Sequence, residues 1–278
     1  MLISVLLVSH NNQKDLELLL PSLRLSLGQI HQQFGEINSE ILLVDNCSSD
    51  STVDFIQKKF SDVVLTKNKT QMGYGANQNQ NIKRAKGKFI LLMNPDMVVP
   101  LNLFSTMINF MESNHDAAVA TCKICNSDGS CQYLNKREPA IIDLFVRRFF
   151  PKIRQIPSKR VPHILQKIQN IIKQRLDLYE MRDVGYDKVV DVPFVSGSFM
   201  FSRASAIKEH NGFDERFFMY FEDVDLCRRL RAKYRLLYCP YVSVIHRWER
   251  ASHKKLKWTL IFALSALQYF SKWGFKFF

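Results

Sequence analysis

Long apolar runs are missing from this sequence. The stretch from Leu260 to Phe270 falls well short of the roughly 20 residues that span a bilayer. The segment Leu2–Val8 is also apolar, but it lacks a basic leader and runs directly into polar residues, unlike a secretory signal. These absences predict a cytoplasmic protein that meets a membrane only peripherally, at the inner face of the cytoplasmic membrane.

Zinc-binding cysteine clusters and repeats are also missing. Cys122 and Cys125 form a CxxC motif with Cys131 nearby, but no fourth ligand follows at the spacing of a zinc site. The six cysteines therefore fit reduced thiols. The hydrophobic content of 46% and charged content of 23% are those of a globular protein, and 278 residues suffice for one sizeable core.

Acidic residues are in the minority: 26 Asp and Glu stand against 39 Lys and Arg, giving a formal net charge of +13. This charge indicates an anionic partner, which could be nucleic acid, an anionic membrane surface or a phosphorylated substrate. Basic residues gather between Lys136 and Arg175, and between Lys254 and Lys276 they alternate with aromatic residues. That mixture favours a membrane interface; a solvated basic face beside a core-packing helix is the alternative.

Short apolar runs alternate with helical patterns in the first half of the chain. This alternation predicts an α/β fold with a mostly parallel central sheet flanked by helices. The expected strands are Ile3–Val8, Glu40–Val44, Val63–Leu65, Phe89–Met93 and Ala117–Thr121.

The second half of the chain is less regular. Residues from about 128 to 190 are basic and interrupted by prolines, and we expect a largely helical insertion there, with a helix over Ile164–Tyr179. After the insertion, the expected strands are Val192–Phe201, Arg235–Tyr238 and Val242–Ile245, and the expected helices are Asp223–Lys233 and Leu256–Trp273. We therefore predict one domain over residues 1–255 and a C-terminal amphipathic, possibly membrane-associating helix over residues 256–278.

Acidic motifs follow several of these strands. Asp45 stands in Val44-Asp45-Asn46-Cys47-Ser48-Ser49-Asp50, Asp96 in Met93-Asn94-Pro95-Asp96, and the pair Glu222-Asp223 precedes an expected helix. The carboxyl ends of parallel strands meet at one edge of a sheet, where open α/β sheets bind nucleotides. Carboxylates at a nucleotide site usually hold a metal ion and the base of the nucleotide, so the sequence predicts a nucleotide-dependent enzyme.

In this order the motifs resemble the family 2 inverting glycosyltransferases of GT-A (Rossmann-like) fold, in particular rhamnosyltransferase-like bacterial members that build surface polysaccharide. The resemblance covers roughly residues 2–125 and 190–275. It implies an enzyme that moves one sugar from a nucleotide-sugar donor, such as dTDP-rhamnose or a UDP-hexose, to a lipid-linked or oligosaccharide acceptor in the synthesis of lipopolysaccharide, O-antigen or capsule.

The resemblance also implies a donor site and a metal site. A Mg²⁺ or Mn²⁺ ion would be held by Asp96 and His246 and completed by the donor diphosphate and waters. The implied donor-binding residues are Ser9, Asn11, Asp45, Gly73, Asn79, Asn94, Asp96, Arg250 and Ser252. The alternatives are that Asp45 stabilises a turn, that Asn-Pro-Asp is only turn chemistry, and that His246 is structural.

On the acceptor side, the resemblance implies that Asp223 is the general base and that Glu222 recognises acceptor hydroxyls. An inverting transfer needs such a base, because the acceptor hydroxyl must lose its proton as it attacks. The helix dipole favours an ionised carboxylate at a helix N-terminus. The alternative is that both acids are only favourable charges in the first helical turn.

Two other functions stay open. A nucleotidyltransferase that makes the activated sugar would also use a strand-end aspartate and a metal, but its glycine-rich loop is not matched by Ser9–Lys14, which has no glycine. A non-catalytic protein could bind a membrane or nucleic acid through the positive charge. No recognised nucleic-acid module is apparent, so we expect no nucleic acid partner.

Overall fold

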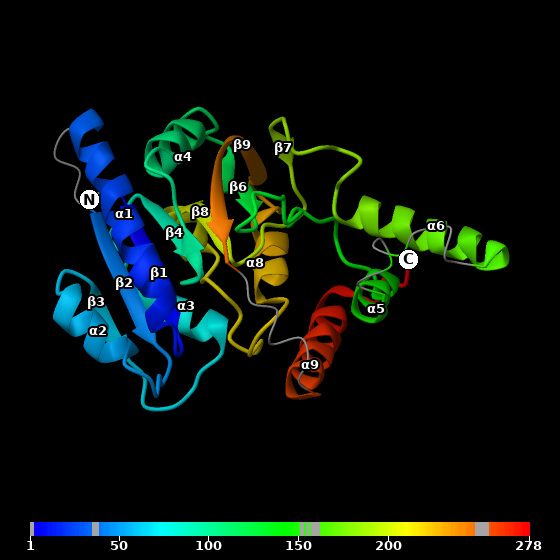
Figure 1. Ribbon diagram of the computed structural model, residues 1–278, viewed down its shortest axis with the longest axis horizontal. Coiled ribbons are helices and arrows are strands. Elements are labelled where there is room, and N and C mark those ends of the chain that lie inside the picture. Colours follow the sequence, from blue (N-terminus) through cyan, green and yellow to red (C-terminus); the bar gives the residue numbers. More distant parts are fainter. Residues whose placement is uncertain (1–2, 35–38, 151–152, 154–155, 157–161, 248–255) are drawn as a thin grey trace.

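The computed structural model describes residues 3–34, 39–150, 153, 156, 162–247 and 256–278. Within these residues the protein is built on one nine-stranded sheet with helices on both faces, and the segment that carries α5 and α6 extends from one end of it (Figure 1). The predicted α/β fold with a largely parallel sheet is confirmed.

One half of the sheet is entirely parallel. Its strands lie in the order β3-β2-β1-β4 and comprise β1 (Ile3–Ser9), β2 (Ser39–Asp45), β3 (Val64–Lys67) and β4 (Phe89–Met93). All four are rich in leucine, isoleucine or valine, and β1 and β4 are buried along nearly their whole length. Continuous apolar runs of this kind are typical of strands covered on both faces.

The other half of the sheet mixes directions. Strand β8 lies antiparallel between β4 and β6, β6 runs parallel to β9, and β5 and β7 pair antiparallel with β9. The bounds are β5 (Met97–Val98), β6 (Ala117–Cys125), β7 (Val190–Asp191), β8 (Phe199–Arg203) and β9 (Arg235–His246). Strands β6 and β9 thus point the same way as β1 to β4, so their carboxyl ends reach the same edge.

Two hydrophobic layers cover the sheet. Alternate residues of β1 face opposite sides, so Leu7 joins one layer and Leu6 the other. The layer with Leu7 includes α1 and α4, and the layer with Leu6 includes α3, α8 and α9. The helices are α1 (Gln13–Phe34), α2 (Thr52–Lys59), α3 (Tyr74–Arg84), α4 (Leu103–Glu112), α5 (Ile141–Phe149), α6 (His163–Tyr179), α7 (Ala204–Glu209), α8 (Glu222–Leu230) and α9 (Leu256–Trp273).

Two expected segments differ from the structure. The two strands predicted on either side of Pro240 are one strand, β9, because the sheet register shifts between Cys122 and Lys123 and leaves residues 240–242 out of the pairing with β6. Such a bulge accommodates a residue that has no N–H to donate. The strand predicted over residues 192–201 begins only at Phe199, because residues 196–199 form a turn in which Phe199 N donates to Ser196 O.

The C-terminal helix α9 packs on the segment that precedes α8. The ring of Phe221 lies 5.4 Å from those of Phe262 and Tyr269, and Ser265 Oγ donates to Met219 O over 2.8 Å. Trp273 Nε1 donates to a buried carboxylate of α8. Among the helices that the structure describes, none is both long and apolar enough to cross a membrane. The predicted amphipathic helix is thus present, and one face of it belongs to the core.

Candidate functional site

Strand ends gather the predicted residues at one edge of the sheet (Figure 1). Ser9 ends β1 in register with Asp45 at the end of β2, and His246 ends β9 in register with Met97 of β5. Asp96 directly precedes β5. Neighbouring strands lie about 4.8 Å apart, so β2 and β4, on either side of β1, place their motifs about 10 Å from each other.

Asp45 is buried and engaged within the protein. Its Oδ1 accepts hydrogen bonds from the Ser9 and Ser48 hydroxyls, and its Oδ2 accepts one from Ser48 N at 3.0 Å. The exposed Asn11, with φ +59°, accepts hydrogen bonds at Oδ1 from the backbone N–H groups of Ser49 and Asp50. These bonds join the loops after β1 and β2, and roles for Ser9, Asn11 and Asp45 in donor binding stay predictions.

Gly73 and Asn79 bring α3 against the segment before α8. A Cβ atom on Gly73 would lie 2.7 Å from Phe218 O, so the close approach of two backbones requires glycine there. Asn79 is buried; its Nδ2 donates to Phe213 O and Glu215 Oε1, and its Oδ1 accepts from Phe213 N. Both residues therefore fix α3 against the segment before α8, and their contact with a donor stays a prediction.

Asp96 and His246 lie together. His246 Nε2 is 3.3 Å from Asp96 Oδ1, and the imidazole is 5% exposed. Gln132, which sequence reasoning missed, fixes this ring: its Nε2 donates to His246 O at 2.8 Å and to Asn126 Oδ1, so its Oε1 faces His246 Nδ1 at 2.9 Å. An amide oxygen can only accept, and Nδ1 therefore carries the proton.

This tautomer decides what can lie between the two side chains. In the neutral ring, the Nε2 lone pair faces a carboxylate oxygen of Asp96, and two acceptors at 3.3 Å repel unless a proton or a cation lies between them. A carboxylate and an imidazole are suitable ligands for a divalent ion. The described residues include no cluster of three or more His, Cys, Asp or Glu side chains suited to holding a metal, so a bound ion would take its other ligands from substrate and water.

A turn at residues 196–198 joins this pair to the acidic pair of α8. Asn94 N donates to Ser198 O at 3.0 Å, and Gly197 N donates to Asp223 Oδ2 at 2.8 Å. Tyr74 of α3, also missed from the sequence, donates its hydroxyl to Gly197 O at 2.8 Å. The turn thus unites the Asn-Pro-Asp motif, α3 and the N-terminus of α8.

The backbone before α8 is strained. Tyr220 and Phe221 have φ of 70° and 67°, a left-handed conformation that costs bulky residues about 1–3 kcal/mol each. The aromatic contacts between Phe221 and α9 hold this conformation. As a result, α8 begins abruptly and presents Glu222 and Asp223 in its first turn.

Glu222 and Asp223 form a buried acidic pair. Burial, and next the charge of Asp223, raise the pKa of Glu222 well above its usual range. Burial also raises the pKa of Asp223, but hydrogen bonds from Gly197 N and Val224 N and the charge of Lys136 oppose that shift. The pair therefore holds its shared proton on Glu222 and leaves Asp223 as the carboxylate.

Two predicted residues, Arg250 and Ser252, lie outside the described residues.

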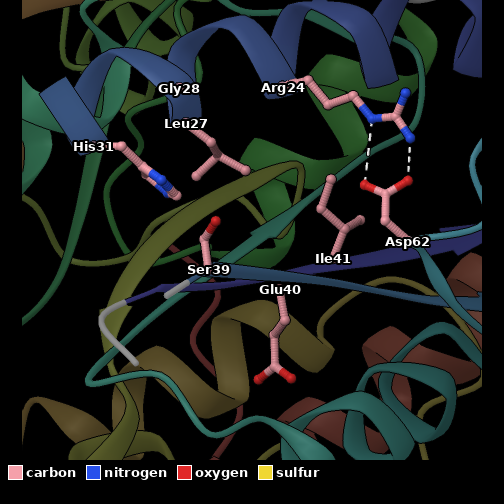
Figure 2. Close-up of a pocket in the computed structure, with 8 residues that line it drawn as sticks. All are labelled: Arg24, Leu27, Gly28, His31, Ser39, Glu40, Ile41 and Asp62. Carbon is pink, nitrogen blue, oxygen red and sulfur yellow. Dashed lines mark hydrogen bonds and ion pairs between the residues drawn. The ribbon is translucent and has the colours of Figure 1, made fainter. Parts of the chain in front are cut away.

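A pocket lined in part by Leu27, His31 and Ile41 lies beside the ion pair between Arg24 and Asp62 (Figure 2). It borders the amino end of β2, the edge opposite Asp45, and none of the predicted site residues lines it.

The acidic pair predicts a pH-dependent stability. Because folding raises the pKa of Glu222, its stabilising contribution is complete at pH values below its unfolded pKa and is lost as the pH rises through its folded pKa. The variant Glu222→Gln should melt like the wild type near pH 5, and its Tm should exceed that of the wild type by roughly a few degrees for each pH unit between the unfolded and the folded pKa of Glu222, with a constant difference above the folded pKa.

Thermal unfolding between pH 5 and 9 checks this, with the exposed Glu17→Gln as control. If the difference in Tm between the wild type and Glu222→Gln does not change with pH over this range, Glu222 is not protonated by burial.

The chain is similar in sequence to two known rhamnosyltransferases. Over 88% of the chain, the sequence is 26% identical to the rhamnosyltransferase WbbL of Escherichia coli (strain K12), covering 83% of that protein. Over 74% of the chain, it is 27% identical to N-acetylglucosaminyl-diphospho-decaprenol L-rhamnosyltransferase of Mycobacterium tuberculosis (strain ATCC 25618 / H37Rv), covering 66% of it.

Two known structures share the fold. The crystal structure of S. aureus TarS 1–349 matches 97% of this chain with a TM-score of 0.59 and 17% identity, and the chain spans 66% of it. The mannosyltransferase PcManGT from Pyrobaculum calidifontis, in complex with GDP-Man and Mn²⁺, matches 97% of the chain with a TM-score of 0.56 and 15% identity, and the chain spans 63% of it. At these identities the likeness establishes the fold alone.

A family match covers most of the chain. The sequence pattern of Glycosyl transferase family 2 extends over residues 4–182, through most of the basic insertion that the sequence resemblance left out. Strand-end motifs, fold and sequence pattern thus agree, and the chain belongs to glycosyl transferase family 2.

Proposed function

We propose that this protein is an inverting glycosyltransferase that moves a sugar from dTDP-rhamnose or a UDP-hexose to a lipid-linked or oligosaccharide acceptor in the synthesis of a bacterial surface polysaccharide. Its similarity to two rhamnosyltransferases, one named for a diphospho-decaprenol acceptor, supports this substrate class. The glycosyl transfer reaction is inferred from membership of the family.

One observation carries the proposal: the turn at residues 196–198 bonds both to Asn94 of the Asn-Pro-Asp motif and to Asp223. A pair suited to a diphosphate-bound cation and a carboxylate suited to a base therefore lie on either side of one turn. A single displacement needs this arrangement, because the leaving group and the attacking hydroxyl must stand on opposite faces of the anomeric carbon.

Asp223 has the geometry of the base. Its two oxygens accept hydrogen bonds from Gly197 N and Val224 N, which fix the carboxylate, and Glu222 keeps the neighbouring proton. As the acceptor oxygen bonds to the anomeric carbon, its proton passes to Asp223 and the bond to the donor diphosphate breaks. Glu222, protonated and buried beside it, can donate a hydrogen bond to another acceptor hydroxyl.

Asp96 and His246 would hold Mg²⁺ or Mn²⁺ with the donor diphosphate. When bound, the ion neutralises charge that develops on the leaving nucleoside diphosphate. Gln132 keeps the proton on His246 Nδ1, so that Nε2, next to Asp96, would be the ligand atom. The roles of the remaining donor residues are predicted from the sequence, and two of them, Arg250 and Ser252, lie outside the described residues.

The C-terminal helix supports a peripheral membrane location. Leu256, Leu260, Leu264 and Leu267 are more than half exposed, and helical geometry places them within about 80° of arc on α9, away from its buried face. The exposed rings of Phe275, Phe277 and Phe278 follow. An apolar stripe next to lysines, in a chain of charge +13, suits an anionic lipid surface.

The base assignment predicts the effect of Asp223→Asn. The amide keeps the size of the carboxylate and can still accept the hydrogen bond from Gly197, but it cannot take a proton. Sugar transfer should fall by roughly 10²- to 10⁴-fold while nucleotide affinity is preserved. Radiolabelled dTDP-rhamnose and UDP-hexoses with a lipid-diphosphate sugar acceptor provide the assay, and the anomeric configuration of the product tests inversion. Unchanged turnover would refute the role of Asp223.

The metal assignment predicts that Mn²⁺ raises the Tm only when a nucleoside diphosphate is also present, because the protein supplies too few ligands alone. In Asp96→Asn, the Mn²⁺ concentration that gives half of the maximal Tm increase should rise by at least about tenfold. Calorimetric scans over an Mn²⁺ titration measure it, and the exposed Asp187→Asn is the control. Equal titrations for Asp96→Asn and the control would remove Asp96 from the metal site.

The membrane assignment predicts that the protein sediments with phosphatidylglycerol vesicles and much less with phosphatidylcholine vesicles. The double variant L260S/L264S should lose most of this binding, since it removes two exposed leucines from the stripe. L18S/L25S removes two exposed leucines from α1 and serves as the matched control. Loss of binding in both variants, or in neither, would contradict a surface on α9.

A further inference from the structure

Lys136 is a buried cation that the proposed mechanism does not use. The residue is 6% exposed, and within the part of the chain that the structure describes, no hydrogen bond or ion pair engages its Nζ. Burial first, and then the charge of Arg147, lower the pKa of Lys136 to about 7, although the charges of Glu180 and Asp223 oppose that shift. A buried ammonium group without a partner is unfavourable, so its presence calls for an explanation.

Two more hydrogen-bond donors near Lys136 lack a partner among the described residues: the hydroxyl of the buried Tyr179, 5% exposed, and the guanidinium of the partly buried Arg147 on α5. The charge of Arg147 lowers the pKa of both Lys136 and Tyr179, which places the three groups near one another. The buried Lys136 and the partly buried Arg147 carry like charges that repel, and an anion between them would relieve the repulsion.

The backbone places these donors beside the proposed base. Lys136 forms a β-bridge with Phe194, three residues before Gly197, whose N–H binds Asp223. Arg137 N donates to Tyr179 O at 2.9 Å, so the end of α6 lies against the same segment. Accordingly, the charge of Lys136 acts on Asp223 and that of Asp223 acts on Tyr179.

An apolar surface lies on the elements that contact α5. Helix α5, which carries Arg147, bonds to the chain end through Ile141 N to Lys276 O at 2.9 Å, and to α9 through Arg148 and Thr259. Figure 1 shows α5 beside α9. The exposed apolar residues of α9 and the C-terminal tail thus lie on elements that contact both α5 and the segment before α8.

We propose that Lys136, Arg147 and Tyr179 bind a phosphate of the acceptor, which is a sugar linked through phosphate or diphosphate to a lipid. The inference rests on the proposed function. It assigns the sugar hydroxyl to Asp223, the phosphate to the three donors, and the hydrocarbon chain to the neighbouring apolar surface. The basic insertion is then an acceptor-binding element.

Inorganic pyrophosphate, in the presence of a chelator that removes divalent ions, tests the anion site without turnover. It should raise the Tm of the wild type and of Asp96→Asn, because the site does not involve the metal pair. Lys136→Met should abolish the effect and itself melt no lower than the wild type, since it removes an unpaired buried charge. The exposed Lys167→Met is the matched control, and Arg147→Gln is a second test variant. Equal stabilisation of Lys136→Met and Lys167→Met would overturn the site.

Kinetics then test the acceptor assignment. With a prenyl-diphosphate-linked sugar, Lys136→Met should raise the acceptor KM roughly tenfold or more and leave the donor KM unchanged. With an alkyl glycoside of the same sugar, which has no phosphate, Lys136→Met and the wild type should have equal KM. A raised donor KM would assign the anion to the donor and overturn the proposal.

Failure of the proposed function has a different signature. Loss of pyrophosphate stabilisation in Lys136→Met, together with no sugar transfer from any nucleotide sugar, would overturn the acceptor assignment and the proposed function while leaving an anion site. Transfer by a wild type that pyrophosphate does not stabilise would overturn the anion site and leave the function.

Discussion

The hydrogen bond from Gly197 N to Asp223 is the contact on which the site depends. It ties the first turn of α8 to the turn at residues 196–198, and the same turn receives the Asn94 N–H and the Tyr74 hydroxyl. Three elements from distant parts of the chain are thereby fixed in position relative to one turn. A buried polar connection of this kind is stringent, because each lost partner leaves an unsatisfied group in a low dielectric.

The conformation around this contact is costly and is offset by packing. The left-handed backbone at Tyr220 and Phe221 opposes folding by about 1–3 kcal/mol per residue. Contacts of Phe221 with Phe262 and Tyr269 oppose that cost, since aromatic pairs contribute about 0.5–1.5 kcal/mol each beyond their buried area. The acidic pair is thus held in an unusual backbone by residues that lie about 40 positions later in the chain.

Strand-end motifs were accessible from the sequence because they follow local rules. Continuous apolar runs predicted β1, β2 and β4, and the residues that follow them had to emerge at one edge. The bulge at Pro240 and the turn before β8 were missed, because each depends on register with a distant strand. Gln132 and Lys136 gave no signal either: one is an ordinary amide and the other a lysine among many, and only their buried neighbours give them significance.

Asp225 has a consequence for how the protein can be divided. Its carboxylate is fully buried and binds Arg229 of its own helix together with Lys272 and Trp273 from the last turn of α9. In a chain cut before α9, the buried Asp225 carboxylate would keep Arg229 as its partner and lose Lys272. Breaking a buried ion pair costs roughly 3–5 kcal/mol of stability. The C-terminal segment is therefore a structural part of the domain, because Lys272 and Trp273 neutralise and bind a buried carboxylate of α8. Any change made to α9 to alter its exposed face must keep these two contacts.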